Sequence, residues 1–482
     1  MSVIDISNRR EVMWDYHLID RDKTTAALTM GKLQKKEKVI TFDKLWEGDS
    51  ISYPHTVKDG DLYRMYYITT ISDLSKMKSK DGVHEDVVHN LCCIESKDGI
   101  NWYRPKLTHC KWMDFDDNNI VIKGGLDNFF VFIDENPSCP KEEKYKGLFA
   151  DDWGRDENGI HAKLHFAVSE DGIHFERRGV LLEEGQFDSL NTAYWCDDRN
   201  KYICFYRRIT DGYNGFRKIF FAESPDFKNW TIHGELNYSD GNPFPLYTNG
   251  VAPYYRAPHI LSGIPTRYVE RQEWTPNYDA LPSPEIRKKI MEAQPRYGLA
   301  LTDAMFMCSR DGKNWQRMPE AFMAEGLEHE GIWFYGDCYP TFAPVETKDE
   351  NGNSEMSFYV TEGHWDGKPT PLVRYTLRLD GFSSFYGGYD KKTVVTKPIK
   401  FSGNTMEMNF RTSVAGSIRV NILDEDGRII SGFKGIEMFG NNTKRRVYFE
   451  SGSDVSALSG KTIRLEFILC DAHIYSYMFC NE

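Results

Sequence analysis

Polar side chains stand repeatedly beside short apolar segments of this 482-residue chain, at the points where strands are expected to begin. These residues are Glu47, Asp49, Asp127, Asp188, Asn191, Asn249, Arg256, His259 and Asp337. Carboxylates that converge in one pocket raise each other's pKa values and can divide the roles of acid and base between them. Asp also favours turns that lead into strands, so each residue taken singly fits a structural role as well. As a set, they predict a polar funnel that binds a substrate and carries acid–base chemistry.

A second group of reactive side chains follows a predicted strand further along the chain. The segment YVTEGHWDG holds Glu362, His364 and Trp365, which could donate a proton and stack on the face of a sugar. A polar hairpin with one packed tryptophan explains the segment equally well, and the Glu-His-Glu run at 328–330 has the same two interpretations. The histidines within 84–89 fit a solvated loop better than a metal site. We therefore expect no metal ion and no cofactor.

The elements that would position these residues are marked by a repeat of the form Ser-x-Asp-x-x-x-aromatic. Its four copies contain Asp98, Asp171, Asp226 and Asp311 and keep identical internal spacing. Each copy follows a β-like run, and in three of the four copies an Asp-Gly pair supplies a tight turn into the next strand. Each unit therefore predicts an antiparallel sheet of about four short strands, and sheets repeated radially form a propeller. The four aspartates should then occupy equivalent positions.

A fifth unit is expected at about 337–390, where an Asp380-Gly381 turn is kept but the serine and aromatic positions are lost. The sequence therefore predicts an all-β chain in which a five-bladed β-propeller, the catalytic domain, occupies 1–390. The segment around Asp15 predicts an N-terminal strand that closes the ring or reaches the funnel.

Two further segments stand apart from the repeat. An insertion at about 262–300 contains SPEIRKKIMEAQ, in which Ser283 as N-cap and Pro284 at the first helical position predict a helix at the rim of the fourth blade. From 391 to 482, alternating apolar and polar residues separated by Gly, Asn and Asp turns predict a C-terminal β-sandwich domain.

Charge and cysteine content restrict the partners and the compartment. Lysine and arginine number 60 against 72 acidic residues, and the net charge of −12 argues against nucleic acid and anionic membranes as partners. No run of 18 apolar residues predicts a membrane span, and the first ten residues lack the apolar region of a signal peptide. The ten cysteines form no CxxC pair, which predicts free thiols in a reducing compartment. We expect a cytoplasmic protein, and the composition leaves a homo-oligomer open.

The four Ser-x-Asp turns, the opening WEGDSISYPHTV with DGDLYRMYY, and the predicted sandwich resemble the five-bladed propeller glycosidases of families 32, 43, 62 and 68. The similarity is closest to bacterial proteins described as family 32 N-terminal-like with a C-terminal β-sandwich, and it covers nearly the whole chain at the level of architecture. Family 32 opens on an N-D-P-N-G-type motif, where this chain has Glu47-Gly48-Asp49-Ser50, and the R-D-P and E-C motifs of that family are absent.

The resemblance implies a bacterial glycoside hydrolase that cleaves a small furanoside or pyranoside oligosaccharide. By place in the fold, Asp49 would be the base or nucleophile and Asp188 a transition-state or pKa modulator. Asp337 or Glu362 would be the acid, although neither matches a family motif. The other polar residues named above would bind the substrate.

Two alternatives remain open at this stage. A glycoside phosphorylase on the same fold would need basic residues for phosphate, and Arg256 with His259, or Arg207 with Arg208, could supply them. A carbohydrate-binding propeller would stack sugars in the funnel without hydrolysing them.

Overall fold

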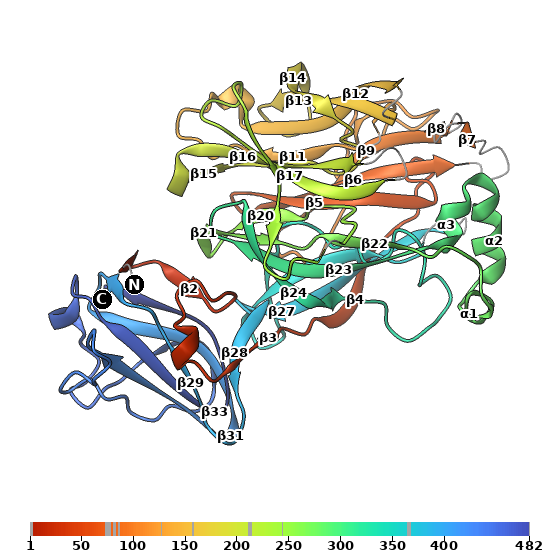
Figure 1. Cartoon of the computed structure of the whole chain (residues 1–482). Coiled ribbons are helices and arrows are strands. Elements are labelled where there is room, and N and C mark those ends of the chain that lie inside the picture. Colours follow the sequence, from red (N-terminus) through yellow and green to blue (C-terminus); the bar gives the residue numbers. More distant parts are fainter. Residues whose placement is uncertain are drawn as a thin grey trace. The chain divides into compact units, whose positions relative to one another are not determined.

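The structure is a computed structural model that describes residues 3–72, 79–80, 83–84, 87–126, 128–156, 159–210, 215–242, 244–363 and 368–481. The chain divides into two compact units (Figure 1). The propeller unit comprises Leu33–Tyr254 and Pro258–Thr376. The C-terminal unit comprises Met1–Lys32, Tyr255–Ala257 and Leu377–Glu482.

Five sheets form the propeller unit, which confirms the predicted all-β class and five-bladed propeller. In the first three blades the strands follow one another across the sheet in sequence order. They are β5 (Ser50–Asp59), β6 (Leu62–Ser72), β9 (Val87–Ser96) and β10 (Ile120–Ile122) in blade 1; β11 (Phe130–Ile133), β12 (Tyr145–Asp156), β13 (Gly159–Ser169) and β14 (Glu176–Gly185) in blade 2; and β15 (Thr192–Cys196), β16 (Lys201–Thr210), β17 (Phe216–Ser224) and β18 (Thr231–Glu235) in blade 3.

Blades 4 and 5 are less regular. Blade 4 holds β20 (Val251–Tyr254), β21 (Ala257–Gly263), β22 (Thr266–Glu270), β23 (Ala300–Ser309), β24 (Asn314–Met323) and the short β19 (Asn237–Tyr238). Blade 5 holds β25 (Val345–Lys348), β26 (Ser354–Thr361), β27 (Thr370–Arg378) and, as its outermost strand, β4 (Gln34–Phe42). A two-stranded ribbon, β7 (Ser79–Lys80) and β8 (Val83–His84), interrupts blade 1.

The first strands of neighbouring blades lie beside one another. β5 contacts β11, β11 contacts β15, and β15 contacts β20. A parallel bridge joins His55 of β5 to Phe342, in the segment that leads into β25. First strands that run in parallel begin at the same end of the ring. The segments that precede them therefore gather at one end of the propeller, which we call the entrance end.

The four Ser-x-Asp turns have the same geometry, as predicted. In the first, the Ser96 hydroxyl donates to Asp98 Oδ1 at 3.0 Å, and the Asp98 carboxylate accepts from the next backbone N–H groups. The equivalent serine–aspartate bonds in the other copies measure 3.0, 3.1 and 3.2 Å. Three of the turns also join neighbouring blades. Tyr66 donates to Gly172 O, Arg199 to Asp311 O, and Tyr359 to Gly99 O.

The closure of the fifth blade differs from the prediction. Its fourth strand is β4, which pairs with β27 from Phe42 opposite Thr370 to Gln34 opposite Thr376. The Asp380-Gly381 turn lies in the C-terminal unit, where the fully buried Asp380 carboxylate pairs with Arg10 and Arg256. That turn leads into β28 (Ser383–Gly387), a strand that pairs with others of the C-terminal unit, so its assignment to a blade was wrong.

The predicted helix at the rim of blade 4 is present between β22 and β23. Three helices occupy the insertion, namely α1 (Pro276–Ala280), α2 (Pro284–Ala293) and α3 (Pro295–Leu299). Pro284 begins α2 as expected, but Ser283 makes no side-chain capping bond because it takes a left-handed conformation with φ of 54°.

The C-terminal unit is built on a seven-stranded sheet. Its strands are β2 (Arg10–Val12), β3 (Ala27–Met30), β28, β29 (Lys392–Val395), β31 (Thr405–Leu423), β32 (Asn441–Arg446) and β33 (Arg464–Cys480), and a parallel pair, β1 (Ile4–Ser7) with β30 (Ile399–Phe401), lies apart from it. Short 3-10 segments occur in both units. They are η1 (Arg21–Lys23) and η4 (Ser456–Leu458) in the C-terminal unit, and η2 (Lys141–Glu143) and η3 (Asp197–Arg199) in the propeller unit.

The unit boundaries differ from the expected division at residue 390. Strands from the first 32 residues pair with β28, β30 and β33, so the N-terminal segment belongs to the C-terminal unit. Asp15 lies there too, in a loop where its carboxylate accepts from the His17 N–H at 2.9 Å. The N-terminal strand that closes the ring is instead β4.

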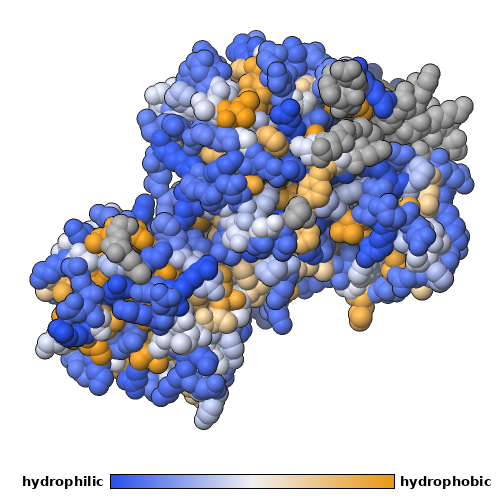
Figure 2. All heavy atoms as spheres, viewed as in Figure 1, coloured by the Kyte–Doolittle hydropathy of each residue, from blue (hydrophilic) through white to orange (hydrophobic). Residues whose placement is uncertain are grey.

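Hydrophilic residues cover much of the face in Figure 2, with hydrophobic residues in small groups among them. Among the described residues, no helix is both long and apolar enough to cross a lipid bilayer. All ten cysteines are free thiols in the structure. The compartment stays a prediction.

Candidate active site

Three carboxyl groups come together at the entrance end of blades 4 and 5. Glu325 follows the end of β24, Asp337 lies in the segment that leads into blade 5, and Glu362 follows the end of β26. The Glu325 and Asp337 side chains are hydrogen-bonded to each other, and both also interact with the charge of Glu362. We call Glu325, Asp337 and Glu362 the carboxyl cluster.

Burial and mutual repulsion keep protons on this cluster. Burial, together with the charge of Glu362, raises the pKa of Glu325 to about 7. Burial, followed by the charge of Glu325, raises the pKa of Asp337 well above its usual range. The Phe334 N–H donates to Asp337 Oδ2 at 2.6 Å, and the Cys338 thiol donates to Glu325 Oε1 at 3.1 Å. Two carboxyl groups bonded in this way can share a proton near neutral pH.

The third member of the cluster has a cationic partner. Lys35 Nζ lies 2.6 Å from Glu362 Oε1, and the Tyr375 hydroxyl donates to the same oxygen at 3.2 Å. The cluster therefore combines a carboxylate that is ion-paired with Lys35 and two carboxyl groups that can share a proton. Acid–base catalysis requires this division between a charged group and a protonated group.

A pocket of about 120 Å³ opens beside the cluster. Glu325, Trp333 and Phe334 line it, together with Arg271 and Asp303. Glu325 thus reaches a cavity, whereas Asp337 is only 2% exposed. Of the bonded pair, Glu325 is the member that can meet a ligand.

The raised pKa of Glu325 predicts a pH-dependent stability. A carboxyl group whose pKa is raised by folding stabilises the fold below its unfolded pKa, and this contribution is lost as pH rises through the folded pKa. We expect wild-type protein to lose stability between about pH 4.5 and 7, and Glu325→Gln to escape that loss. The difference should reach about 3 kcal/mol, at ~1.4 kcal/mol per pKa unit. Urea unfolding at pH 5 and pH 8 measures it, with Glu328→Gln as the exposed control. Equal pH profiles for wild type and Glu325→Gln would contradict the assigned pKa.

Asp49 and Asp188 lie at the entrance end, each partly exposed, just before the first strands of blades 1 and 3. The Asp49 N–H donates to the Thr70 carbonyl at 3.1 Å, which fixes its backbone. The Asp188 carboxylate forms an ion pair with Arg207, and Arg207 also donates to the Asp188 carbonyl at 2.9 Å. The Asp188 side chain is 29% exposed and the Arg207 side chain 2%.

Three of the predicted substrate-binding residues are used within the fold instead. Glu47 is fully buried, and Arg104 donates to both of its oxygens, at 2.9 and 2.8 Å. The Asn191 amide donates to two carbonyls of its own loop. Asn249 donates to the Leu190 carbonyl at 2.9 Å and so joins blade 4 to blade 3. Their hydrogen-bonding groups hold the strand-entry segments in place.

Arg256 and His259 lie in or beside the hairpin that joins β20 to β21. Arg256 lies in the hairpin between β20 and β21 and belongs to the C-terminal unit, where its guanidinium pairs with Asp380 at 2.8 Å. His259 lies two residues into β21, next to that hairpin.

Asp127, His364 and Trp365 lie outside the described residues. Of the run 328–330, Glu330 pairs on the surface with Lys368 at 2.5 Å.

The sequence identified Asp337 and Glu362 but missed Glu325, Cys338 and Lys35. Glu325 stands before Gly326 at the end of a predicted strand, which is a weak signal because such residues are common in loops. Lys35 lies in β4, which reaches the cluster only because this strand closes the ring.

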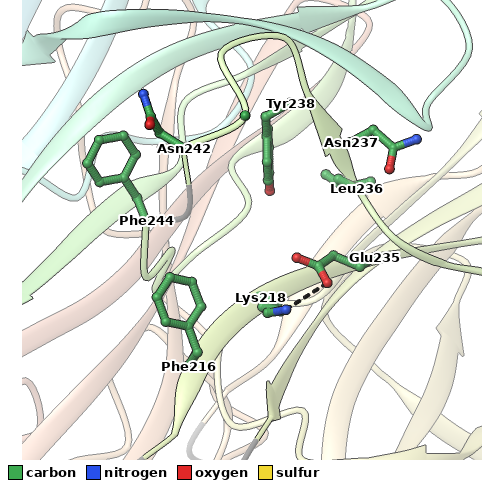
Figure 3. Close-up of a pocket in the computed structure, with 9 residues that line it drawn as sticks. Phe216, Lys218, Glu235, Leu236, Asn237, Tyr238, Asn242 and Phe244 are labelled. Atoms are coloured by element: carbon green, nitrogen blue, oxygen red, sulfur yellow. Dashed lines mark hydrogen bonds and ion pairs between the residues drawn. The ribbon is translucent and has the colours of Figure 1, made fainter.

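A larger pocket, of about 370 Å³, lies at the rim of blades 3 and 4. Figure 3 shows Phe216 and Phe244 on one side and Asn237 on the other. The Lys218 ammonium donates to Glu235 at 2.8 Å, so the carboxylate of this pocket is already paired. It therefore offers aromatic and amide surface but no carboxyl pair.

Comparisons with known proteins give matches only among solved structures. No protein-family model and no curated protein matches the chain. An N-acetylgalactosamine deacetylase from F. plautii is 11% identical over 74% of this chain and 95% of its own, with a TM-score of 0.42. A β-fructofuranosidase of family GH32 from Bombyx mori is 9% identical over 99% and 96%, with a TM-score of 0.40.

A third similar structure is reported under a title on the GH130 family of mannoside phosphorylases, which contains glycoside hydrolases targeting β-1,2 mannosidic linkages in Candida mannan. It is 14% identical over 73% of this chain and 96% of its own, with a TM-score of 0.39. These values describe a distant likeness of fold alone.

Proposed function

We propose that the propeller unit is a glycoside hydrolase that cleaves small furanoside or pyranoside oligosaccharides at its entrance end. The observation that carries the proposal is the hydrogen-bonded pair of Glu325 and Asp337, with a raised pKa on each carboxyl group. Hydrolysis of a glycoside needs a carboxylic acid that still holds its proton near neutral pH and a carboxylate that does not.

Glu325 donates its proton to the leaving oxygen of the glycosidic bond, because it is the member of the pair that lines a pocket. Asp337 positions Glu325 through their hydrogen bond, while burial and the charge of Glu362 raise the pKa of Glu325. Asp49 acts as base or nucleophile from blade 1. Asp188, ion-paired with Arg207, stabilises the positive charge that develops on the sugar ring in the transition state. Glu362 repels a second negative charge and so keeps the pair protonated.

A glycoside phosphorylase is the second candidate. Arg207, which the sequence suggested for phosphate, is a buried arginine at the entrance end. Arg256, of the other predicted pair, is already ion-paired with Asp380 in the C-terminal unit. A binding propeller has less support, because holding a sugar by hydrogen bonds does not require two coupled carboxyl groups of raised pKa.

Turnover of a panel of aryl glycosides and short oligosaccharides, in buffers with and without phosphate, tests the proposal. We expect release of free reducing sugar without phosphate, at a rate that falls as pH rises through about 7. Strict dependence on phosphate with formation of a sugar 1-phosphate would favour the phosphorylase. Binding of sugars without turnover of any panel member would leave the carbohydrate-binding propeller.

A further inference from the structure

Arginine and tyrosine side chains from several elements meet beside the carboxyl cluster. We call them the arginine–tyrosine cluster, and its members are Arg207 of β16, Arg217 of β17, Arg296 of α3, Tyr247 of the segment before β20, Tyr268 of β22, and Tyr335 and Tyr339. The last two flank Asp337 in sequence, so one short segment carries members of both clusters.

Ring contacts hold the guanidinium groups together. Arg207 lies 4.6 Å from the centre of the Tyr247 ring, and Arg217 lies 5.7 Å from that ring and 4.2 Å from the ring of Tyr268. Arg296 donates to the Tyr268 hydroxyl at 3.3 Å. Tyrosine faces attract cations but carry no charge to neutralise them.

The arginines lack partners for part of their hydrogen-bonding capacity. The Nε atoms of Arg207, Arg217 and Arg296 are buried, and among the described residues none has a hydrogen-bond acceptor. The hydroxyl of Tyr339 is likewise buried without a partner in the described part of the chain. Buried donors are normally satisfied, so this concentration of free donors marks a place for an acceptor.

The charges do not balance either. Within the described residues, the only carboxylate in an ion pair with these three arginines is Asp188, which pairs with Arg207. Arg217 is only 7% exposed and forms no ion pair there. Burying a guanidinium group without a counter-charge costs free energy, and a bound anion would recover part of that cost.

Tyr247 reports the same excess of positive charge. Burial raises the pKa of its hydroxyl, but Arg207, Arg296, the hydrogen bond with Tyr335 and Arg217 together lower it by more, and the pKa falls below the ordinary value. Tyr335 also donates to the Tyr247 oxygen at 2.6 Å. The site therefore stabilises negative charge on an oxygen atom.

We propose that the arginine–tyrosine cluster binds an oxyanion, a carboxylate, phosphate or sulfate group that belongs either to the sugar substrate or to free inorganic phosphate. Asp188, the ion-pair partner of Arg207, has a side chain that is 29% exposed, so solvent reaches this edge of the cluster. The inference rests on the proposed function, since it makes the substrate of that site acidic or the reaction phosphate-dependent, but anion binding itself does not require turnover.

Direct binding measured by calorimetry tests this proposal on the full chain. The probes are inorganic phosphate, sulfate, D-glucuronate and, as the neutral counterpart, D-glucose. We expect the oxyanions to bind wild type more tightly than glucose. Arg217→Gln and Arg296→Gln should weaken that binding roughly 10- to 100-fold, the scale for one charge-assisted hydrogen bond. Arg178→Gln, an exposed arginine paired with Glu176 in blade 2, serves as the control and should change nothing.

Two comparisons make the outcome decisive. Arg217→Lys keeps the charge and should retain part of the affinity, even if Arg217→Gln unfolds. Failure of all three anions to bind wild type, or unchanged affinity in both arginine variants, overturns the anion site. Hydrolysis of neutral glycosides would then leave the glycosidase standing. Tighter binding of glucuronate than of phosphate assigns the anion to the sugar, and the reverse, together with phosphate-dependent turnover, assigns it to a co-substrate.

Discussion

Glu325→Gln is expected to lower kcat on oligosaccharides by roughly 10²–10⁴-fold, the scale for loss of a positioned general acid. Glutamine keeps the size of the side chain but cannot release a proton to the leaving oxygen. The loss should shrink for aryl glycosides with acidic leaving groups, because these depart without protonation. Steady-state kinetics on a matched oligosaccharide and nitrophenyl glycoside measure the difference.

Two controls separate catalysis from damage to the fold. Glu328→Gln changes an exposed residue of the same loop and should leave kcat unchanged. The hydrogen bond with Asp337 lowers the pKa of Glu325, and Asp337→Asn replaces that acid with a weaker donor, so the alkaline limb of the pH–rate profile should move to higher pH. Equal losses on good and poor leaving groups in Glu325→Gln would show that Glu325 is not the acid.

Asp49→Asn and Asp188→Asn are each expected to reduce kcat by roughly 10²–10⁴-fold. An oxocarbenium-like transition state gains from nearby negative charge, and asparagine removes that charge while keeping the size of the side chain. The measurement is kcat and KM on the substrate identified by the panel. Near wild-type kcat in either variant would remove that residue from the mechanism.

The two variants should differ in stability. The ion pair with Arg207 gives Asp188 a role in folding. Asp188→Asn leaves a buried guanidinium without its carboxylate, so its thermal midpoint should fall below that of Asp49→Asn. Asp188→Glu is the matched variant that keeps the charge.

Most of the propeller could be predicted from local patterns in the sequence. The spacing of serine, aspartate and aromatic residue sets one self-contained turn, whose bonds join residues two or three positions apart. Such geometry depends on neighbours in the chain. It could therefore be predicted for all four copies without knowledge of the rest of the structure.

The site was harder to predict because its members come from distant segments. The same local feature, a polar residue before a strand, appears at Asn249 and at Asp337. One side chain bonds to a neighbouring blade and the other to Glu325. Which of the two occurs depends on the packing of the next blade and not on local sequence. Glu325 and Lys35 lie 290 positions apart in the chain and meet around Glu362 only after the ring has closed.

The pairing of β4 with β27 has a consequence for how the protein is made. Gln34 leaves the ribosome early, whereas its partner Thr376 emerges more than 300 residues later. At roughly 5–20 residues per second, the interval lasts on the order of tens of seconds. The interval is longer still for the other N-terminal strands, because β1 pairs with β30, β2 with β33 and β3 with β28. For that time the nascent chain carries unpaired strands, which can join other chains edge to edge, so molecular chaperones that shield the N-terminal strands should raise the yield of active protein.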